Sequence, residues 1–348
     1  MNGLQTTIQH GVDIWNDSCD LDELQEAIQH GANGATSNPV IVTQVFNKQP
    51  DRWMPVLQKI IKNNPQAHET EIAWMLISEV GQTAAKLLEP IYQKTDHQKG
   101  FLSLQVSPHF YRSSDKMVKH ALELNKLAPN LAIKLPATPE GLIAVEEVAA
   151  KGARVNVTAA FTVAQAIESA NALERGYKRL GRQEPCWVSL LIGRTEDAIK
   201  QVVDKERLDI SPTSLCWAGA AVFKESARIF REKNSQPKLL AAAYRHKLHW
   251  SELTGPDVVM TMGYRWWKQF HASKAPSSPT LFTPVPEIAL DELKTIPRFL
   301  DFYEPDRLKI EQFKSLEPMS YTLKQFQEGT DQLIHTVRSQ MLKDYEKK

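Results

Sequence analysis

The chain has 348 residues, of which 42% are hydrophobic and 24% are charged, as expected for a globular protein with a substantial core. Its 42 Lys and Arg residues balance 41 Asp and Glu residues, so the formal net charge is +1 and no global field favours nucleic acid or an acidic membrane. The length fits two average domains or one large α/β domain, and composition does not distinguish these alternatives.

The cysteines and the N-terminus both favour a cytoplasmic protein. Cys19, Cys186 and Cys216 are odd in number, far apart and without metal-ligand spacing, which favours reduced thiols. Residues 1–17 lack the apolar segment of a signal peptide, and no apolar run approaches the ~18 residues of a membrane span. We therefore expect neither a membrane nor a nucleic-acid partner.

Short apolar runs recur along the chain, and a longer stretch with helical spacing follows each of them. The predicted strands are residues 12–17, 33–38, 101–107, 131–137, 154–160, 186–193, 238–245 and 257–263. Eight such units with right-handed crossovers predict a (β/α)8 barrel. The alternative is an open doubly wound sheet, but no glycine-rich nucleotide-binding motif follows any strand.

Start and stop signals support two of the crossover helices. Asp20 precedes the first, and Gly31 ends it. Thr138 and Pro139 begin the helix after the fourth strand, and Gly152 ends it. From residue 281 the chain is rich in proline and ends in a charged amphipathic helix over residues 321–348. We expect one domain over residues 1–348, with a barrel core at about 12–280 and a helical extension, 281–348, packed on the barrel.

Lys134 interrupts the apolar fourth strand, LAIKLPA. Leu131, Ile133 and Leu135 share one face of this strand, so Lys134 lies on the other face, between Ala132 and Pro136. Desolvation lowers the pKa of a lysine and makes its amine a nucleophile towards carbonyl groups. The alternative is a lysine whose amine extends to solvent or pairs with an acid, and composition alone does not decide between the two.

Polar residues also occur in or just after other predicted strands, where barrel enzymes place their catalytic groups. They are Asp17, Asn38, Gln105, Asn156, Thr158, Ser189, Arg194 and Arg245. Some have simpler explanations. Asp17 could cap the following helix, Asn38 could be a turn residue, and Arg194 could form a surface ion pair with Glu196 or Asp197.

Four segments stand out in the sequence: NDSCDLDEL, GATSNPVIV, AIKLPATPEGLIAVEEVAAKGARVNVTAAFTVAQAIESA and VSLLIGR. In their order and spacing they resemble successive signatures of the transaldolase family, and the resemblance covers roughly residues 12–265. It implies a (β/α)8 barrel that performs class I aldol chemistry without a metal or an organic cofactor.

The resemblance also implies roles for the polar residues. Lys134 matches the lysine that forms a Schiff base with a ketose phosphate, and Asp17 matches the residue that takes the C4 hydroxyl proton. Asn38 and Asn156 match residues that hydrogen-bond the dihydroxyacetone unit, and Ser189 matches a substrate-binding serine.

The remaining matches concern water and phosphate. Thr158 matches the threonine that, with the third-strand residue Gln105, positions the catalytic water. Arg194 and Arg245 match the arginines that hold the substrate phosphate, which suits the paired hydrogen bonds that guanidinium groups donate.

Three positions depart from the family pattern. Transaldolases usually have glutamate where this chain has Gln105, whereas fructose 6-phosphate aldolases have glutamine there and a tyrosine in the sixth strand, where this chain has Leu191. Ala243 replaces a common serine two residues before Arg245. His246 and His249 are three apart, but no third metal ligand is near them in the sequence, so we expect no metal site.

The sequence therefore predicts a transaldolase of the pentose phosphate pathway. Such an enzyme transfers a dihydroxyacetone unit from sedoheptulose 7-phosphate to glyceraldehyde 3-phosphate, giving erythrose 4-phosphate and fructose 6-phosphate. Two alternatives stay open, an aldolase that releases dihydroxyacetone and a catalytically weak sugar-phosphate-binding protein. Sugar phosphates are the expected partners, and a homodimer stays an open alternative.

Overall fold

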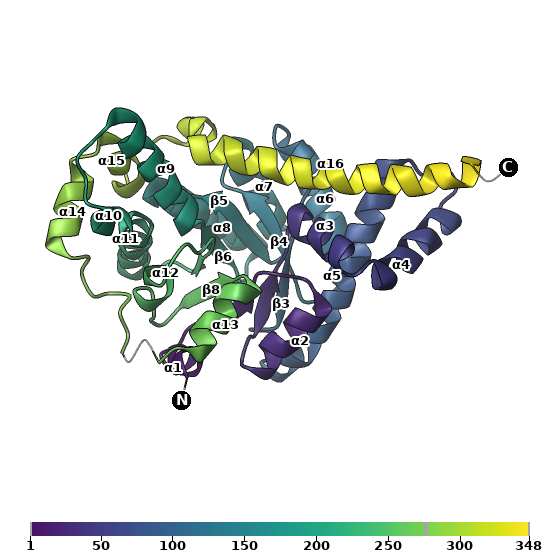
Figure 1. Ribbon diagram of the computed structural model, residues 1–348, viewed down its shortest axis with the longest axis horizontal. Helices are drawn as coiled ribbons and strands as arrows, with labels where there is room; N and C mark the ends of the chain where they lie inside the picture. The colour runs from purple at the N-terminus through teal and green to yellow at the C-terminus, as the bar shows by residue number, and fades with distance from the viewer. Residues whose placement is uncertain (1, 275–277, 347–348) are drawn as a thin grey trace.

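A computed structural model describes residues 2–274 and 278–346 of the chain. In this part, eight parallel strands close into a barrel in chain order, which confirms the predicted (β/α)8 barrel (Figure 1). The strands are β1 (Asp13–Asn16), β2 (Gly34–Thr36), β3 (Phe101–Gln105), β4 (Leu131–Pro136), β5 (Val155–Ala160), β6 (Trp187–Leu190), β7 (Lys238–Ala241) and β8 (Val258–Met262).

Helices surround the barrel and connect its strands (Figure 1). Those that precede β5 are α1 (Gly3–Gln9), α2 (Leu21–Gln29), α3 (Pro39–Lys48), α4 (Pro50–Asn63), α5 (Glu69–Lys94), the 3-10 helix η1 (Pro108–Phe110), α6 (Ser114–Asn125) and α7 (Pro139–Ala150). Those that follow β5 are α8 (Val163–Leu180), α9 (Ile192–Glu206), α10 (Pro212–Leu215), α11 (Ala218–Lys233), α12 (Leu248–Ser251), α13 (Tyr264–Ala272), α14 (Glu287–Lys294), α15 (Pro297–Tyr303), the 3-10 helix η2 (Ile310–Ser315) and α16 (Glu317–Glu346).

The predicted capping residues act as expected. The Asp20 side chain accepts hydrogen bonds from two backbone N–H groups in the first turn of α2. Thr138 caps α7, and Pro139 is the first residue of that helix. Gly31 and Gly152 follow α2 and α7 with positive φ angles of 105° and 81°, a conformation that glycine adopts without steric cost.

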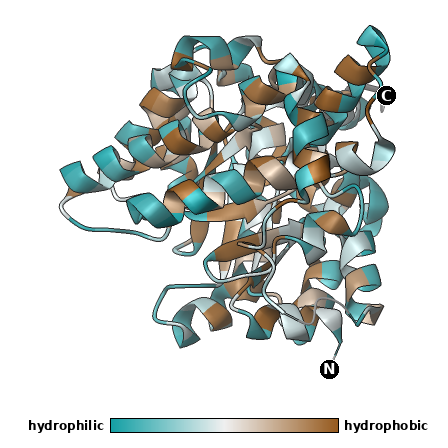
Figure 2. Cartoon of the chain, turned by 90° about the vertical axis from the view of Figure 1, so that its left-hand side faces the viewer, coloured by the Kyte–Doolittle hydropathy of each residue, from teal (hydrophilic) through white to brown (hydrophobic). Residues whose placement is uncertain are grey.

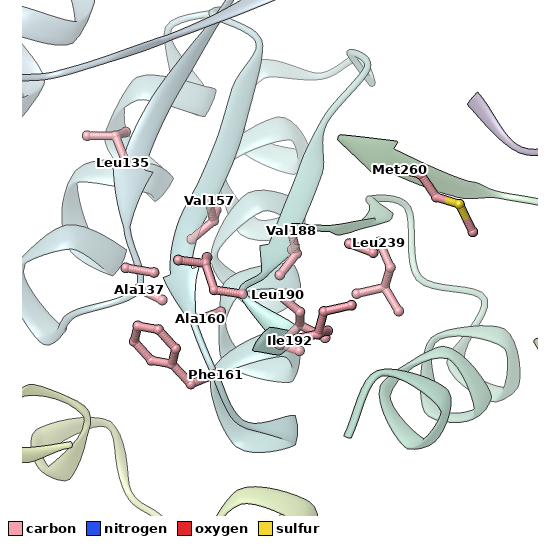
Figure 3. Close-up of a cluster of buried hydrophobic side chains, with 14 of the residues drawn as sticks. Leu135, Ala137, Val157, Ala160, Phe161, Val188, Leu190, Ile192, Leu239 and Met260 are labelled. Carbon is pink, nitrogen blue, oxygen red and sulfur yellow. The ribbon is translucent and has the colours of Figure 1, made fainter. Parts of the chain in front are cut away.

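Apolar side chains fill the space between the barrel and its helices. Figure 3 shows part of this layer, in which Leu135, Val157, Val188 and Leu239 project from neighbouring strands. Hydrophobic residues gather at the strands, whereas the outer turns of the helices are largely hydrophilic (Figure 2). None of the helices in residues 2–274 and 278–346 is long and apolar enough to cross a membrane.

A separate apolar layer fills the inside of the barrel. We call it the interior layer, and it includes Trp15, Phe101, Ala132, Trp187, Leu240 and Val259. Gly34 makes room for it, because a Cβ atom there would lie 2.4 Å from the Trp15 indole nitrogen. Side chains alternate between the two faces of a strand. The residues two positions beyond those of the interior layer therefore also project into the barrel, nearer to the carboxyl ends of the strands.

Several predicted strands are too long at their carboxyl ends. Strand β2 ends at Thr36, and Asn38 is the N-cap of α3. Strand β6 ends at Leu190, and the last two residues of the predicted sixth strand, Ile192 and Gly193, belong to α9. Strand β7 ends at Ala241, so the prediction that Arg245 closes the seventh strand is wrong. The chain turns there because Ala243 has a φ of 65°, which is incompatible with a strand.

Helix α16 crosses the side of the barrel at which the strands end. It packs against α3, η1, β5 and α9, and Figure 1 shows it running across one whole side of the molecule. The α3 residue Thr43 donates a hydrogen bond to the carbonyl of Gly329 in α16 at 2.8 Å. Residues 347 and 348 of the predicted C-terminal helix lie outside the described residues.

Candidate functional site

Lys134 lies inside the barrel. It is two residues beyond Ala132 of the interior layer, on the same face of β4, and only 6% of it is exposed. Its Nζ atom donates a hydrogen bond to the carbonyl oxygen of Ser37 at 3.1 Å. The structure therefore places this amine inside the barrel, on the face that it shares with Ala132, and not at the solvent boundary.

Burial lowers the pKa of Lys134 from 10.5 to about 8. The nearby carboxylate of Asp17 opposes this shift, and the positive charge of Arg194 adds to it. At pH 7 roughly a tenth of the amine is then neutral, against well under a thousandth for an ordinary lysine. The amine is therefore suited to attack a carbonyl carbon.

A pH series should reveal this lowered pKa. We expect the rate of adduct formation between Lys134 and a ketose phosphate to rise about tenfold per pH unit below pH 8 and to level off above it. The rate is measured by mixing at pH 6 to 10 and quenching into borohydride at one fixed pH. A rate that continues to rise beyond pH 10 would contradict the lowered pKa.

Asp17 directly follows β1 and contacts Thr36, which in turn contacts Thr261. Thr36 donates a hydrogen bond to its Oδ1 atom at 2.5 Å, and the Thr36 and Thr261 hydroxyl oxygens are 2.6 Å apart. Asp17 is not the cap of the following helix, because Asp20 has that role. Its carboxylate is therefore available to a ligand beside Lys134.

Gln105 and Thr158 occupy the strands on either side of β4. Gln105 pairs with Lys134 in the strand register, and Thr158 pairs with Pro136. The buried Oε1 atom of Gln105 has no hydrogen-bond partner among the described residues. Both side chains line a cavity of about 10 Å³, which Leu323 of α16 helps to close. This volume is comparable with the space that one water molecule needs.

A chain of buried side chains crosses the barrel next to Lys134. Ser189 donates to the Asn156 Oδ1 atom at 2.7 Å, and the Asn156 amide donates to the Ser103 hydroxyl at 3.0 Å. Asn38 lies at the start of α3, where its Oδ1 atom accepts a hydrogen bond from the Ile41 N–H. The side-chain amide nitrogen of Asn38 is then the atom that can donate a hydrogen bond to a ligand.

Arg194 contacts the C-terminal helix and not the acids next to it in sequence. Its guanidinium donates to the Thr322 hydroxyl at 2.7 Å and to Gln325. Burial lowers the pKa of Arg194, and the positive charge of Arg245 adds to this effect. Each of the two arginines is thus within the electrostatic influence of the other.

Arg245 follows β7 and pairs with Asp197. Its Nε atom lies 3.1 Å from both carboxylate oxygens, and its Nη2 atom lies 2.6 Å from one of them. Arg194, Asp197 and Arg245 line the same cavity, of about 450 Å³, between α9 and α16. All nine predicted site residues therefore lie in or around the carboxyl end of the barrel.

Other residues of the site escaped the sequence prediction. Thr36, Ser103 and Thr261 lie on interior faces, and their signal was a polar residue within an otherwise apolar strand. Tyr244 is buried, and its hydroxyl has no partner among the described residues. Burial raises the pKa of Tyr244, and the negative charge of the nearby Asp17 adds to this effect. No sequence pattern pointed to Tyr244.

We expected no third metal ligand near His246 and His249, and this expectation is wrong, because the fold brings Glu196 next to both histidines. The ring Nε2 atoms of His246 and His249 lie 2.7 and 2.9 Å from one oxygen of Glu196. The three residues form a cluster with ligand types that zinc prefers. Glu196 was missed because it is about 50 residues away in the sequence.

The fold and the site define a class of protein, a (β/α)8 barrel with a buried lysine and a carboxylate at the carboxyl ends of its strands. The chain belongs to the transaldolase/fructose-6-phosphate aldolase family, whose model matches residues 14–334. This confirms the family resemblance in the sequence, and the chain spans about half the length of the first two relatives described below.

Individual relatives have modest identity to this chain. A transaldolase of Thiobacillus denitrificans is 29% identical over 213 residues, which are 57% of this chain and 58% of the relative. A transaldolase of Thermobifida fusca is 33% identical over 169 residues, or 46% of this chain and 45% of the relative. The match to transaldolase 2 of Nostoc punctiforme is longer, at 25% identity over 75% of this chain and 79% of the relative.

Proposed function

We propose that this protein is a transaldolase that moves a dihydroxyacetone unit from a ketose phosphate to an aldose phosphate through a Schiff base on Lys134. The observation that carries this proposal is the buried Lys134 amine, with its pKa near 8, inside a barrel whose rim bears two arginines. The proposed donor is sedoheptulose 7-phosphate and the proposed acceptor is glyceraldehyde 3-phosphate, as in the pentose phosphate pathway.

Schiff-base formation begins at the neutral amine. The Lys134 nitrogen attacks the C2 carbonyl carbon, and the resulting carbinolamine takes up a proton from water and loses water to give a protonated imine. The Gln105 and Thr158 side chains line a cavity of one-water size in which this water can be held. Gln105 cannot accept a proton as a carboxylate does, so its role is to orient the water by hydrogen bonding.

Carbon–carbon cleavage then requires a base. The Asp17 carboxylate removes the C4 hydroxyl proton, the C3–C4 bond breaks, and the bonding electrons pass into the imine to form an enamine. The first aldehyde leaves, and the enamine attacks the acceptor aldehyde while Asp17 returns the proton. Asn38, Asn156 and Ser189 are placed to hydrogen-bond the hydroxyl groups of the retained unit.

The phosphate group is assigned to Arg194 and Arg245. The guanidinium groups line one cavity, and each donates several hydrogen bonds in a fixed plane that suits phosphate. In this structure Thr322 and Gln325 of α16 accept from Arg194. We propose that α16 is part of the same domain as the barrel, because it contributes to this site.

A second function is favoured by Gln105. A neutral amide in the third strand, next to Lys134, is the feature shared with fructose 6-phosphate aldolases, which release dihydroxyacetone to water. In that case the enamine takes a proton and is hydrolysed without an acceptor. A catalytically weak sugar-phosphate-binding protein would use the same two arginines without the lysine.

Trapping and product analysis separate these functions. We expect fructose 6-phosphate and borohydride to add a reduced dihydroxyacetone unit to Lys134, located by peptide mass spectrometry. Turnover that requires an added aldehyde acceptor supports the transferase, and free dihydroxyacetone without acceptor supports the aldolase. Tight sugar-phosphate binding with no adduct would sink both enzymatic functions.

A further inference from the structure

The buried cluster around Glu196 is not part of the reaction proposed above. Glu196 lies in α9 and is fully buried. Its Oε2 atom is 2.7 Å from the Nε2 atom of His246 and 2.9 Å from that of His249, and its Oε1 atom accepts from Lys200 at 2.6 Å. Burial opposes ionisation of Glu196, but these hydrogen bonds hold the pKa of its carboxyl well below the usual range. The cluster therefore contains a buried carboxylate that three donors satisfy.

The tautomer of His249 follows from its neighbours. The backbone N–H of Arg245 points at the Nδ1 atom of His249, with 3.2 Å between the nitrogens. A backbone N–H only donates, so Nδ1 must be an unprotonated acceptor. The single ring proton is then on Nε2 and is donated to Glu196. His249 thus links the Arg245 backbone to the Glu196 carboxylate.

Helix α9 also holds the other end of Arg245. The guanidinium pairs with Asp197, the residue after Glu196. The turn before Arg245 lies against the start of the same helix, because a Cβ atom on Gly193 would be only 1.9 Å from the Ala243 carbonyl oxygen. Helix α9 therefore holds Arg245 by its backbone and by its side chain, and it also carries Arg194.

We propose that Glu196 and His249 are positioning residues that orient Arg245 towards Arg194, so that the pair binds the phosphate of the substrate. The identity of the anion rests on the function proposed above. The bidentate pairing of a guanidinium with a phosphate depends on angle as well as distance, and an error of about 1 Å in position is enough to weaken it strongly.

A metal ion fits this cluster less well than hydrogen bonds do. A metal on the His249 Nε2 atom would move the ring proton to Nδ1, where it would face the Arg245 N–H. The Lys200 ammonium, 2.6 Å from Glu196, would add repulsion. Zinc binding is therefore a competing outcome of the test.

His249→Phe is the variant that tests the proposal. Phenylalanine keeps most of the ring volume but removes the acceptor for the Arg245 N–H. We expect inorganic phosphate, titrated by calorimetry, to bind about tenfold more weakly. The KM for fructose 6-phosphate should rise by a similar factor. Borohydride trapping of unphosphorylated dihydroxyacetone on Lys134 should proceed at the unchanged rate.

Matched variants control for folding and for the loss of any buried histidine. His120 also accepts a backbone N–H, that of Ser107 at 3.0 Å, but lies away from Arg245. His120→Phe should therefore leave phosphate affinity unchanged. Glu196→Gln keeps an oxygen that can accept from His249, so it should retain most of the phosphate affinity even if His249→Phe fails to fold.

The outcomes are distinct. Phosphate affinity that is unchanged in His249→Phe, or that falls equally in His120→Phe, would overturn the proposal. So would a further loss when His249→Phe is added to Arg245→Met, because a positioning effect requires Arg245. Stoichiometric zinc binding that depends on His249 would show a metal site instead. If wild-type protein traps no ketone, the proposed reaction fails, while the phosphate titration still decides the positioning role.

Discussion

Replacing Lys134 with methionine is expected to reduce turnover by at least about a thousandfold and to remove the borohydride-stable adduct. Methionine has a similar length but no amine, so no imine can form. The experiment combines a coupled assay of fructose 6-phosphate cleavage with the intact mass of the protein after trapping. Turnover within about tenfold of wild type would refute the assignment of Lys134.

The same variant should not lose stability. Because the pKa of Lys134 is about 8 in the folded protein and about 10.5 for a free lysine, the buried charge opposes folding by roughly 3 kcal/mol below pH 8. This penalty disappears as the pH rises from 8 to 10.5. We therefore expect Lys134→Met to unfold at a higher temperature than wild type at pH 7, with a smaller difference at pH 10.

Lys224 offers a matched control. Burial also lowers its pKa to about 8, and the charge of Glu252 opposes the shift. Its amine, however, lies in α11 and donates to the carbonyls of Thr280 and Thr283 at 2.7 and 2.8 Å. The Lys224→Met variant should still form the adduct on Lys134. Lys224 has a lowered pKa but lies outside the barrel interior, so it does not provide a substrate site.

Replacing Asp17 with asparagine should separate adduct formation from bond cleavage. Turnover is expected to fall by roughly 10²- to 10⁴-fold, since the amide cannot take the C4 hydroxyl proton. The adduct should still form, and at pH 7 it should form no more slowly. The Asp17 charge raises the pKa of Lys134, so its removal leaves more neutral amine. Rapid-quench trapping should show the uncleaved sugar accumulating on Lys134.

Thr36→Val is the control for this variant. It removes the hydrogen bond to the Asp17 carboxylate but keeps the carboxylate itself. We expect a loss of turnover of about tenfold or less. An equal loss in Thr36→Val and Asp17→Asn, or an adduct that fails to form in Asp17→Asn, would assign Asp17 a structural role instead.

Local signals in the sequence were enough to predict the barrel. Each strand is an apolar run, and helices such as α2 and α7 carry their own capping residues, Asp20 and Thr138. These signals act over a few residues and depend little on the rest of the chain. The alternation of side chains in β4 likewise predicted that Lys134 and Ala132 share one face, and the structure shows that this face lies inside the barrel.

The ends of the strands were predicted less well. The apolar runs continue past the point at which β6 and β7 end, so the pattern alone extends both strands. Helix α9 begins at Ile192, and β7 ends at Ala241 because the positive φ of Ala243 turns the chain. The residue at which each strand ends depends on how the following segment packs, and the apolar periodicity of the sequence does not indicate that packing.

Sequence alone determined which residues share a face of each strand and which helices connect the strands, because alternation and capping are local properties. Only the tertiary structure decided the partners of the charged groups. Arg194 contacts Thr322, 128 residues away, and Glu196 meets His249, 53 residues away. Such pairs arise when barrel closure brings distant loops to one rim. Their geometry depends on strand register and helix packing, which no single segment encodes.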